Sequence, residues 1–270
     1  MTSTTKRRTR ALDGLYSGAL LLLLLAGWEA AVRVFQIPAF IVPTPSQMLT
    51  ALWNGLNVGI TSSAGFYLHS FYTVGEALAG FIIGSGLGVM LGTLISQSRF
   101  AERIIFPYIL AFQCLPKVAI APLLVVWFGT GFSSKVVIVA MLTFFPLLVN
   151  SIAGFEAVNR DQVALMRSFK ATRWQIFRKV EFPNALPFIF AGLNMAIVYS
   201  LIGALVGEFL GARRGLGVMI VQLNFTMDMA GVFAIFVVLA AIGMVLYFVM
   251  RWIERRVTFW TDHSKNMLGL

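Results

Sequence analysis

The sequence predicts an all-α integral membrane protein with about six transmembrane helices. Three observations support this fold class: 59% of the 270 residues are hydrophobic, only 12% are charged, and the mean hydropathy is +0.84. A soluble domain of this length carries roughly twice that share of charge. Apolar runs of about 20 residues, the length that a helix needs to cross a bilayer, recur along the chain. We therefore expect one transmembrane domain over residues 1–270.

The N-terminal region predicts a cytoplasmic tail followed by the first span. Residues 1–13 are polar and basic, and the apolar run behind them continues past Trp28, which favours an uncleaved helix over a signal peptide. Residues 37–69 contain three prolines and are too polar to span, so we expect an external loop there. Within this loop, residues 45–56 predict an amphipathic helix.

The second span is predicted over residues 70–95. Gly80, Gly84, Gly88 and Gly92 recur every four residues and give this helix a small-residue face, which allows close contact with another helix. The pattern leaves open whether that contact lies within one subunit or between subunits. Glu76 is placed near the outer end of the span, where its side chain is expected to reach the membrane interface.

The third span is predicted to be broken. The apolar run that starts at Ile104 is interrupted by Pro107, Pro116 and Pro122 and contains Lys117. A broken helix at membrane depth is tolerated where the freed backbone is buried in protein or lines a cavity, and transporters often place substrate sites there. A plain bend with no ligand is the alternative, and the sequence leaves both open.

Three further spans complete the prediction, over residues 135–153, 185–205 and 230–250, and a cytoplasmic tail follows over 251–270. The fifth span ends near Glu208, which we expect to form a local ion pair with Arg213 or Arg214.

The basic residues support one topology. With six spans and the N-terminus inside, 16 of the 21 lysines and arginines lie on the cytoplasmic side, as the positive-inside rule requires. Because they recur between apolar spans and form no single patch, the net charge of +10 does not indicate nucleic-acid binding. No GxxxxGK[ST] loop occurs, so any ATP hydrolysis is expected on another chain. His69 and His263 are too few and too far apart for a metal site.

The most charged internal segment is residues 159–187. It predicts two short amphipathic helices on the cytoplasmic side, within a loop over 155–184. The second helix opens with Thr-Arg-Trp-Gln, a capping box between Thr172 and Gln175. We expect Pro183 to end this helix and Pro187 to lie in the first turn of the next one.

This segment resembles the cytoplasmic coupling loop, or EAA loop, of ABC-importer permeases. The residues MRSFKATRWQIFRKVEFPNALPFIFAGL follow the pattern EAARxLGAsxxqxfxxVxLPxAlPxIxxGl, although Lys170 replaces the hinge glycine of that pattern. Three other stretches, IVPTPSQMLTALW, QCLPKVAIAPLLVVWFGTG and GEFLGARRGLGVMI, resemble the permease branch that serves taurine, nitrate, alkanesulfonates and thiamine precursors. The resemblance extends from about Pro43 to the C-terminal tail.

The resemblance implies the type I ABC-importer permease fold in the bacterial inner membrane. It implies a homodimer of this subunit, two ATP-binding subunits that carry ATP and Mg²⁺, and a periplasmic or lipid-anchored solute-binding protein; no cofactor is expected on this chain. The cargo is expected to be a thiamine-precursor pyrimidine, riboflavin, taurine or another sulfonate, or nitrate. Residues expected to couple to the ATPase are Leu165, Met166, Arg167, Phe169, Lys170, Ala171, Arg173, Trp174, Phe177, Pro183 and Pro187.

A translocation path is expected along the dimer interface. The candidate residues on it are Gln113, Pro116, Phe145, Asn150, Tyr199 and Glu208. Two alternative functions are an ion-coupled secondary transporter and a membrane scaffold or sensor without transport. The first would need ionisable groups near the bilayer midplane and usually an internal repeat, and we find no such repeat.

Overall fold

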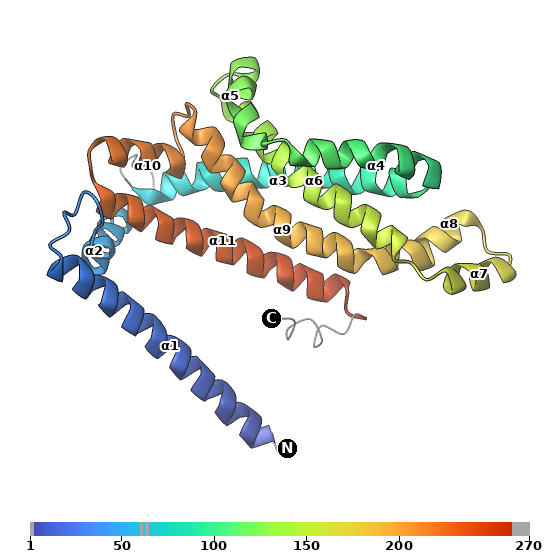
Figure 1. Cartoon of the computed structure of the whole chain (residues 1–270), viewed down its shortest axis with the longest axis horizontal. Coiled ribbons are helices and arrows are strands. Elements are labelled where there is room, and N and C mark those ends of the chain that lie inside the picture. The colour runs from blue at the N-terminus through green and yellow to red at the C-terminus, as the bar shows by residue number, and fades with distance from the viewer. Residues whose placement is uncertain (1–2, 60–61, 63–64, 261–270) are drawn as a thin grey trace. The chain divides into compact units, whose positions relative to one another are not determined.

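The computed structural model describes residues 3–59, 62 and 65–260, and the side chains from residue 16 onward within these ranges. His263 and Lys265, which we considered in the sequence, lie outside them. Figure 1 shows a helical chain. The elements are α1 (Ser3–Val34), α2 (Pro45–Leu56), α3 (Phe66–Ser96), α4 (Arg99–Cys114), α5 (Lys117–Phe128), α6 (Phe132–Glu156), α7 (Arg160–Ser168), α8 (Arg173–Ile176), the π-helix η1 (Phe177–Glu181), α9 (Phe182–Phe209), α10 (Leu216–Phe225) and α11 (Met229–Val257).

The number of spans agrees with the prediction. Within the described residues, five helical segments are long and apolar enough to cross a membrane. They are Tyr16–Val34, Phe66–Ser96, Phe132–Glu156, Arg173–Phe209 and Met229–Val257. The pair α4 and α5 forms a sixth, bent by 86° at the break between its two helices. About six spans is therefore confirmed, and the predicted break in the third span falls at Leu115 and Pro116.

The chain forms two compact units, and the first consists of Met1–Tyr67 and Met219–Val238. Here Glu29 of α1 links this helix to α2 through hydrogen bonds. The Glu29 carboxylate accepts hydrogen bonds from the Ser46 backbone N–H at 3.0 Å and from the Ser46 hydroxyl at 2.9 Å, and it pairs with Arg33 at 2.5 Å. Because these contacts lie at the N-terminus of α2, the negative carboxylate also interacts favourably with the positive end of the α2 helix dipole.

The second unit consists of Leu68–Val218 and Leu239–Leu270 and contains the close packing of α3 on α6. The glycine face of α3 lies directly against α6. A Cβ atom at Gly84 would lie 2.7 Å from Ala140 Cα, and one at Gly88 would lie 2.8 Å from Leu147 Cβ. Such distances leave no room for a side chain, so the glycine face that the sequence left unassigned is used within the subunit.

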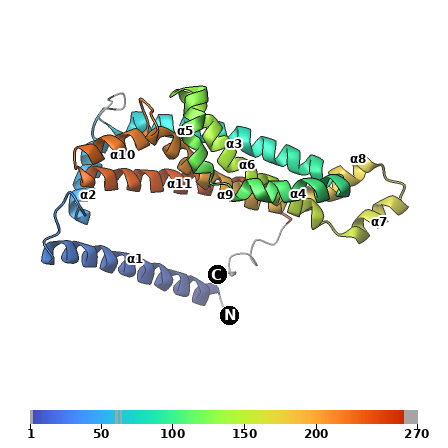
Figure 2. The same ribbon diagram turned by 45° about the horizontal axis from the view of Figure 1, so that its top comes forward.

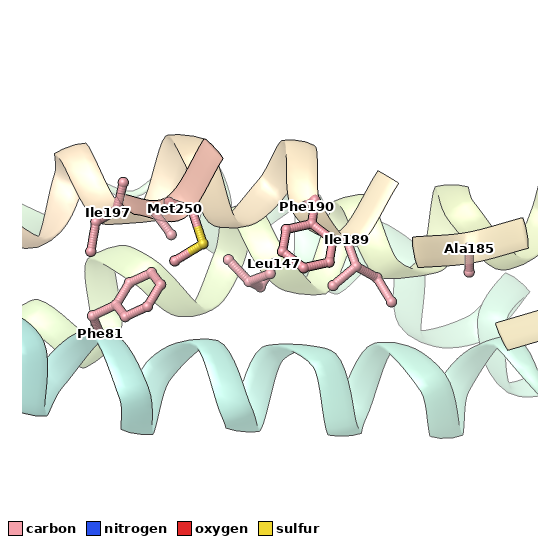
Figure 3. Close-up of a cluster of buried hydrophobic side chains, with 8 residues drawn as sticks. Phe81, Leu147, Ala185, Ile189, Phe190, Ile197 and Met250 are labelled. Atoms are coloured by element: carbon pink, nitrogen blue, oxygen red, sulfur yellow. The ribbon is translucent and has the colours of Figure 1, made fainter. Parts of the chain in front are cut away.

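The apolar core of this unit joins α3, α6, α9 and the second half of α11. Figure 3 shows Phe81 of α3 and Leu147 of α6 facing side chains of α9, with Met250 of α11 beside them. Leu147 is fully buried and Ile189 is 4% exposed. The bundle holds α9 along α6, and Figures 1 and 2 both show α7 and α8 at one end of it.

Candidate functional site

The first helix of the predicted coupling loop is α7. Its N-cap is Asn159, whose side chain accepts a hydrogen bond from the Asp161 N–H at 2.8 Å. Asp161 adds negative charge in the first turn and Arg167 positive charge in the last, which suits the helix dipole. A helix of nine residues, Arg160–Ser168, is thereby defined at both ends.

The turn after α7 is made by Lys170, which occupies the position of the family's hinge glycine. Lys170 has a φ of 55°, in the left-handed region that favours glycine. The Lys170 N–H donates to Arg167 O at 2.9 Å, and the Ala171 N–H donates to Met166 O at 3.1 Å. This pair of bonds is the Schellman arrangement that ends many helices. Lysine therefore makes the same turn as glycine, at a cost in backbone strain.

The second helix opens as the sequence predicts but ends elsewhere. Thr172 and Gln175 form the capping box, with bonds of 2.8 and 3.3 Å. From Arg173 the helix continues without a break to Phe209, so the prediction that Pro183 ends it is wrong. The π-helix η1 widens the backbone just before Pro183. Because proline has no N–H, the regular series of α-helical hydrogen bonds would otherwise be interrupted here. Pro187 lies inside α9.

The loop exposes large apolar side chains beside basic ones. Leu165 is 58% exposed, Phe169 74% and Trp174 66%, which is unusual for large apolar side chains in a charged loop. Arg167, Lys170 and Arg173 are also exposed, whereas Met166, Ala171, Phe177 and Pro183 are partly buried. The predicted coupling residues are thus brought onto one short loop.

The loop is connected to the bundle by side chains. The Phe177 ring stacks on Trp174 at 5.5 Å and on Phe155 of α6 at 5.9 Å. Asn184 of α9 donates to Gln162 of α7 at 3.1 Å. Because these contacts join the loop to both flanking helices, a displacement of α7 and α8 would be transmitted to α6 and α9.

The broken span gathers three of the predicted path residues around Lys117. The Lys117 ammonium donates to Gln113 O at 3.0 Å and lies 4.7 Å from the centre of the Phe145 ring. Gln113 and Pro116 are exposed at the bend. The positive charge of Lys117 is therefore stabilised by the C-terminal end of α4 and by the face of the Phe145 ring.

Two other predicted path residues lie on α6 and α9. Asn150 donates to Pro146 O of its own helix at 2.8 Å, and Tyr199 of α9 is 44% exposed.

Glu208 is only 1% exposed, and its environment differs from the prediction. Its carboxylate accepts hydrogen bonds from Thr73 Oγ1 at 2.6 Å and from the Gly217 N–H at 2.5 Å. Arg214 instead donates to the Tyr72 hydroxyl at 2.6 Å. The expected local ion pair with Arg214 is wrong, because the turn after α9 folds back and places the carboxylate against α3.

Glu76 and Lys135 complete this buried polar cluster. Glu76 is 4% exposed and its carboxyl group lies close to that of Glu208, so the prediction that it reaches the interface is wrong. Lys135 is 1% exposed, donates to Thr130 O and lies near both carboxyl groups. Sequence reasoning missed Thr73 and Lys135, because nothing in their local patterns indicates partners so far away in the chain.

These features define a multispanning membrane permease with a charged pair of short helices at one end of the bundle. Residues 84–259 match the family described as "Binding-protein-dependent transport system inner membrane component". The chain belongs to this family and is the membrane-spanning permease subunit of an ABC importer.

Relatives of named function support this assignment. The chain is 35% identical to the riboflavin transport system permease protein RibX of Chloroflexus aurantiacus, over 89% of this chain and 88% of that protein. It is 32% identical to the formylaminopyrimidine transport permease protein ThiX of Halalkalibacterium halodurans, over 88% and 93%. The fold is similar to a chain of the MetNI methionine ABC transporter, with a TM-score of 0.56, 20% identity, and coverage of 80% of this chain and 99% of that one.

Proposed function

We propose that the loop over residues 159–187 docks on a separate ATPase subunit and transmits its movement to the membrane helices. The observation that carries this proposal is the exposure of Leu165, Phe169 and Trp174 on a basic loop. Large apolar side chains supply contact area in an interface, and neighbouring arginines orient the partner. The loop faces the cytoplasm in the topology that the basic residues favour.

The continuous helix from Arg173 to Phe209 provides the mechanical connection between the docking loop and the membrane-spanning bundle. Its first residues belong to the docking surface and its later residues lie along α6 inside the bundle. A partner that moves α8 therefore moves a span directly, as a rigid element. Two copies of this permease, two ATPase subunits that bind ATP and Mg²⁺, and a solute-binding protein complete the importer. Solute passes at the interface between the copies, with Gln113, Pro116 and Phe145 as candidate contacts.

The cargo that we propose is a small nitrogen heterocycle of the riboflavin or thiamine-precursor pyrimidine class. Relatives at 35% and 32% identity carry these cargoes in their names, whereas the taurine permease TauC of Escherichia coli is 28% identical over 90% of this chain and 88% of that protein. Sulfonates and nitrate are the alternatives. In proteoliposomes that contain the whole importer, riboflavin and formylaminopyrimidine uptake should exceed taurine uptake; the reverse order would refute this cargo class.

Docking is tested by charge substitutions in the loop. We expect Phe169→Asp and Ala171→Asp to abolish co-purification of the ATPase and solute-stimulated ATP hydrolysis, because a buried carboxylate without a partner destabilises an interface. Lys179→Gln, an exposed position in the same segment, serves as the control. Unchanged ATPase co-purification in both aspartate variants would refute the docking proposal.

A further inference from the structure

A cavity of about 960 Å³ lies beside the coupling loop, between α4, the end of α6 and α7. Its lining includes apolar side chains, namely Phe106 and Pro107 of α4 and Phe155 of α6, together with charged ones. A site of this size and mixed character suits a ligand with a polar head and an apolar body.

Four arginines line the cavity, namely Arg99, Arg103, Arg160 and Arg167. Among the side chains that the structure describes, ion pairs within 4.0 Å join Glu29 to Arg33 and Arg251 to Glu254, and none of these four arginines forms one. Several guanidinium groups that line one cavity, none of them in a described ion pair within 4.0 Å, match the requirements of a phosphate.

The same cavity also presents carboxyl groups. Glu102 of α4 and Glu156 of α6 both lie on the lining and are close enough to interact electrostatically, and Glu181 lies on the lining as well. Two neighbouring carboxylates repel one another and are stabilised by a cation placed between them. The arrangement therefore favours a ligand that carries both a phosphate and a positive charge.

The position of the cavity at the end of a spanning helix indicates a lipid. The outer surface of α4 is apolar beside the cavity: Phe100 is 77% exposed, Ile104 47% and Tyr108 65%. In the topology proposed above, this end of α4 lies at the cytoplasmic surface of the bilayer. Basic pockets at that depth between membrane helices are suited to phospholipid headgroups.

We propose that this cavity binds the headgroup of a phospholipid that carries a phosphate and a primary ammonium, as phosphatidylethanolamine does. The arginines hold the phosphate, the Glu102–Glu156 pair accepts the ammonium N–H groups, and the glycerol lies against Phe106. An acidic segment of the ATPase is less suitable, because it would pair with the arginines but leave the Glu102–Glu156 carboxyl groups without a positive partner. The inference rests on the proposed function for its placement at the cytoplasmic surface.

The test uses the purified importer in nanodiscs of three compositions: phosphatidylcholine, phosphatidylcholine with phosphatidylglycerol, and phosphatidylethanolamine with phosphatidylglycerol. Native mass spectrometry measures the lipid retained on the permease. We expect Arg103→Gln with Arg160→Gln to lower retention of every phospholipid about tenfold, as the loss of charge-assisted hydrogen bonds would. Glu102→Gln with Glu156→Gln should remove only the preference for phosphatidylethanolamine, because phosphatidylcholine has no N–H donors. The control is Arg178→Gln with Lys179→Gln.

The possible outcomes separate this inference from the function. Equal retention in wild type and both double variants would overturn the lipid site while ATPase co-purification could still support the coupling proposal. Lipid retained by the isolated permease and absent from the complex would also overturn it, because the ATPase would then fill the cavity. Loss of ATPase co-purification through Phe169→Asp with lipid retention unchanged would support a lipid site that does not depend on docking.

Discussion

The Thr73 hydroxyl donates to Glu208 Oε1 at 2.6 Å and accepts from the Leu216 N–H at 2.9 Å. This one side chain therefore joins α3 to the end of α9 and to the start of α10. Gly217 donates to the other Glu208 oxygen, and a side chain at Gly215 would collide with the same carboxylate. The turn between α9 and α10 is thus built around a carboxylate that is fully enclosed.

Replacing Thr73 by valine tests this connection. The shape of the side chain is nearly kept, but the Leu216 N–H and one Glu208 oxygen lose their partner, and an unsatisfied buried group costs about 1–3 kcal/mol. We expect a lower melting temperature of the detergent-purified protein. Thr93→Val is the matched control, because the Thr93 hydroxyl bonds only to Val89 O of its own helix. Equal melting temperatures of the two variants would contradict the proposed connection.

The glycine face of α3 gives a second prediction. Gly84→Ala would place a methyl group 2.7 Å from Ala140 Cα, and overpacking of this kind costs about 1–3 kcal/mol. We expect lower thermal stability and a lower yield of folded protein.

The control for Gly84 lies on the same helix. A Cβ at Gly86 meets nothing within 4 Å, so Gly86→Ala should leave the stability unchanged or raise it slightly through better helix propensity. Equal losses at both glycines would show that α3 does not pack on α6 through this face.

Local patterns in the sequence were sufficient for some features and insufficient for others. Apolar run length predicted about six spans, and the Thr172–Gln175 spacing predicted a capping box that the structure contains. Both signals arise from neighbours within one helix. The end of the second short helix was predicted wrongly, because a proline such as Pro183 stops a helix only where the backbone cannot widen.

The buried polar cluster could not be predicted for a different reason. Glu208 and Thr73 are 135 residues apart in the chain, so no periodicity relates them. Sequence proximity instead favoured Arg213 and Arg214 as partners. The two glycines at 215 and 217 were the available signal, since close backbone approach to another group is a common reason for paired glycines.

Lys170 provides a test of strain in the coupling loop. Its φ of 55° costs a non-glycine residue about 1–2 kcal/mol, and a β-branched side chain tolerates this region least. We expect Lys170→Gly to slow hydrogen exchange of the Ala171 N–H, which bonds to Met166 O, and Lys170→Val to accelerate it. Lys179→Gly, in the same polar segment and outside the turn, is the comparison. If glycine and valine at 170 had the same effect, the turn would not depend on backbone conformation.

The bend of the third span offers the last prediction. Lys117 holds its ammonium over the Phe145 ring and against the carbonyl that ends α4. Such a cation contributes about 0.5–2 kcal/mol through the ring alone. Because a charge at membrane depth is costly, such residues often mark transport paths. We expect Lys117→Met to lower solute uptake by proteoliposomes about tenfold while ATPase co-purification is unchanged.

Lys117→Arg separates the charge from the packing of this side chain. Arginine keeps a cation that can cover the Phe145 ring, so uptake should recover at least partly, whereas a purely structural requirement for the lysine shape would leave both variants equally impaired. Lys179→Met, at an exposed position of the polar loop, should transport normally. Normal uptake in Lys117→Met would remove the bend from the translocation path, because the loss of the Lys117 charge would then have no consequence for the solute.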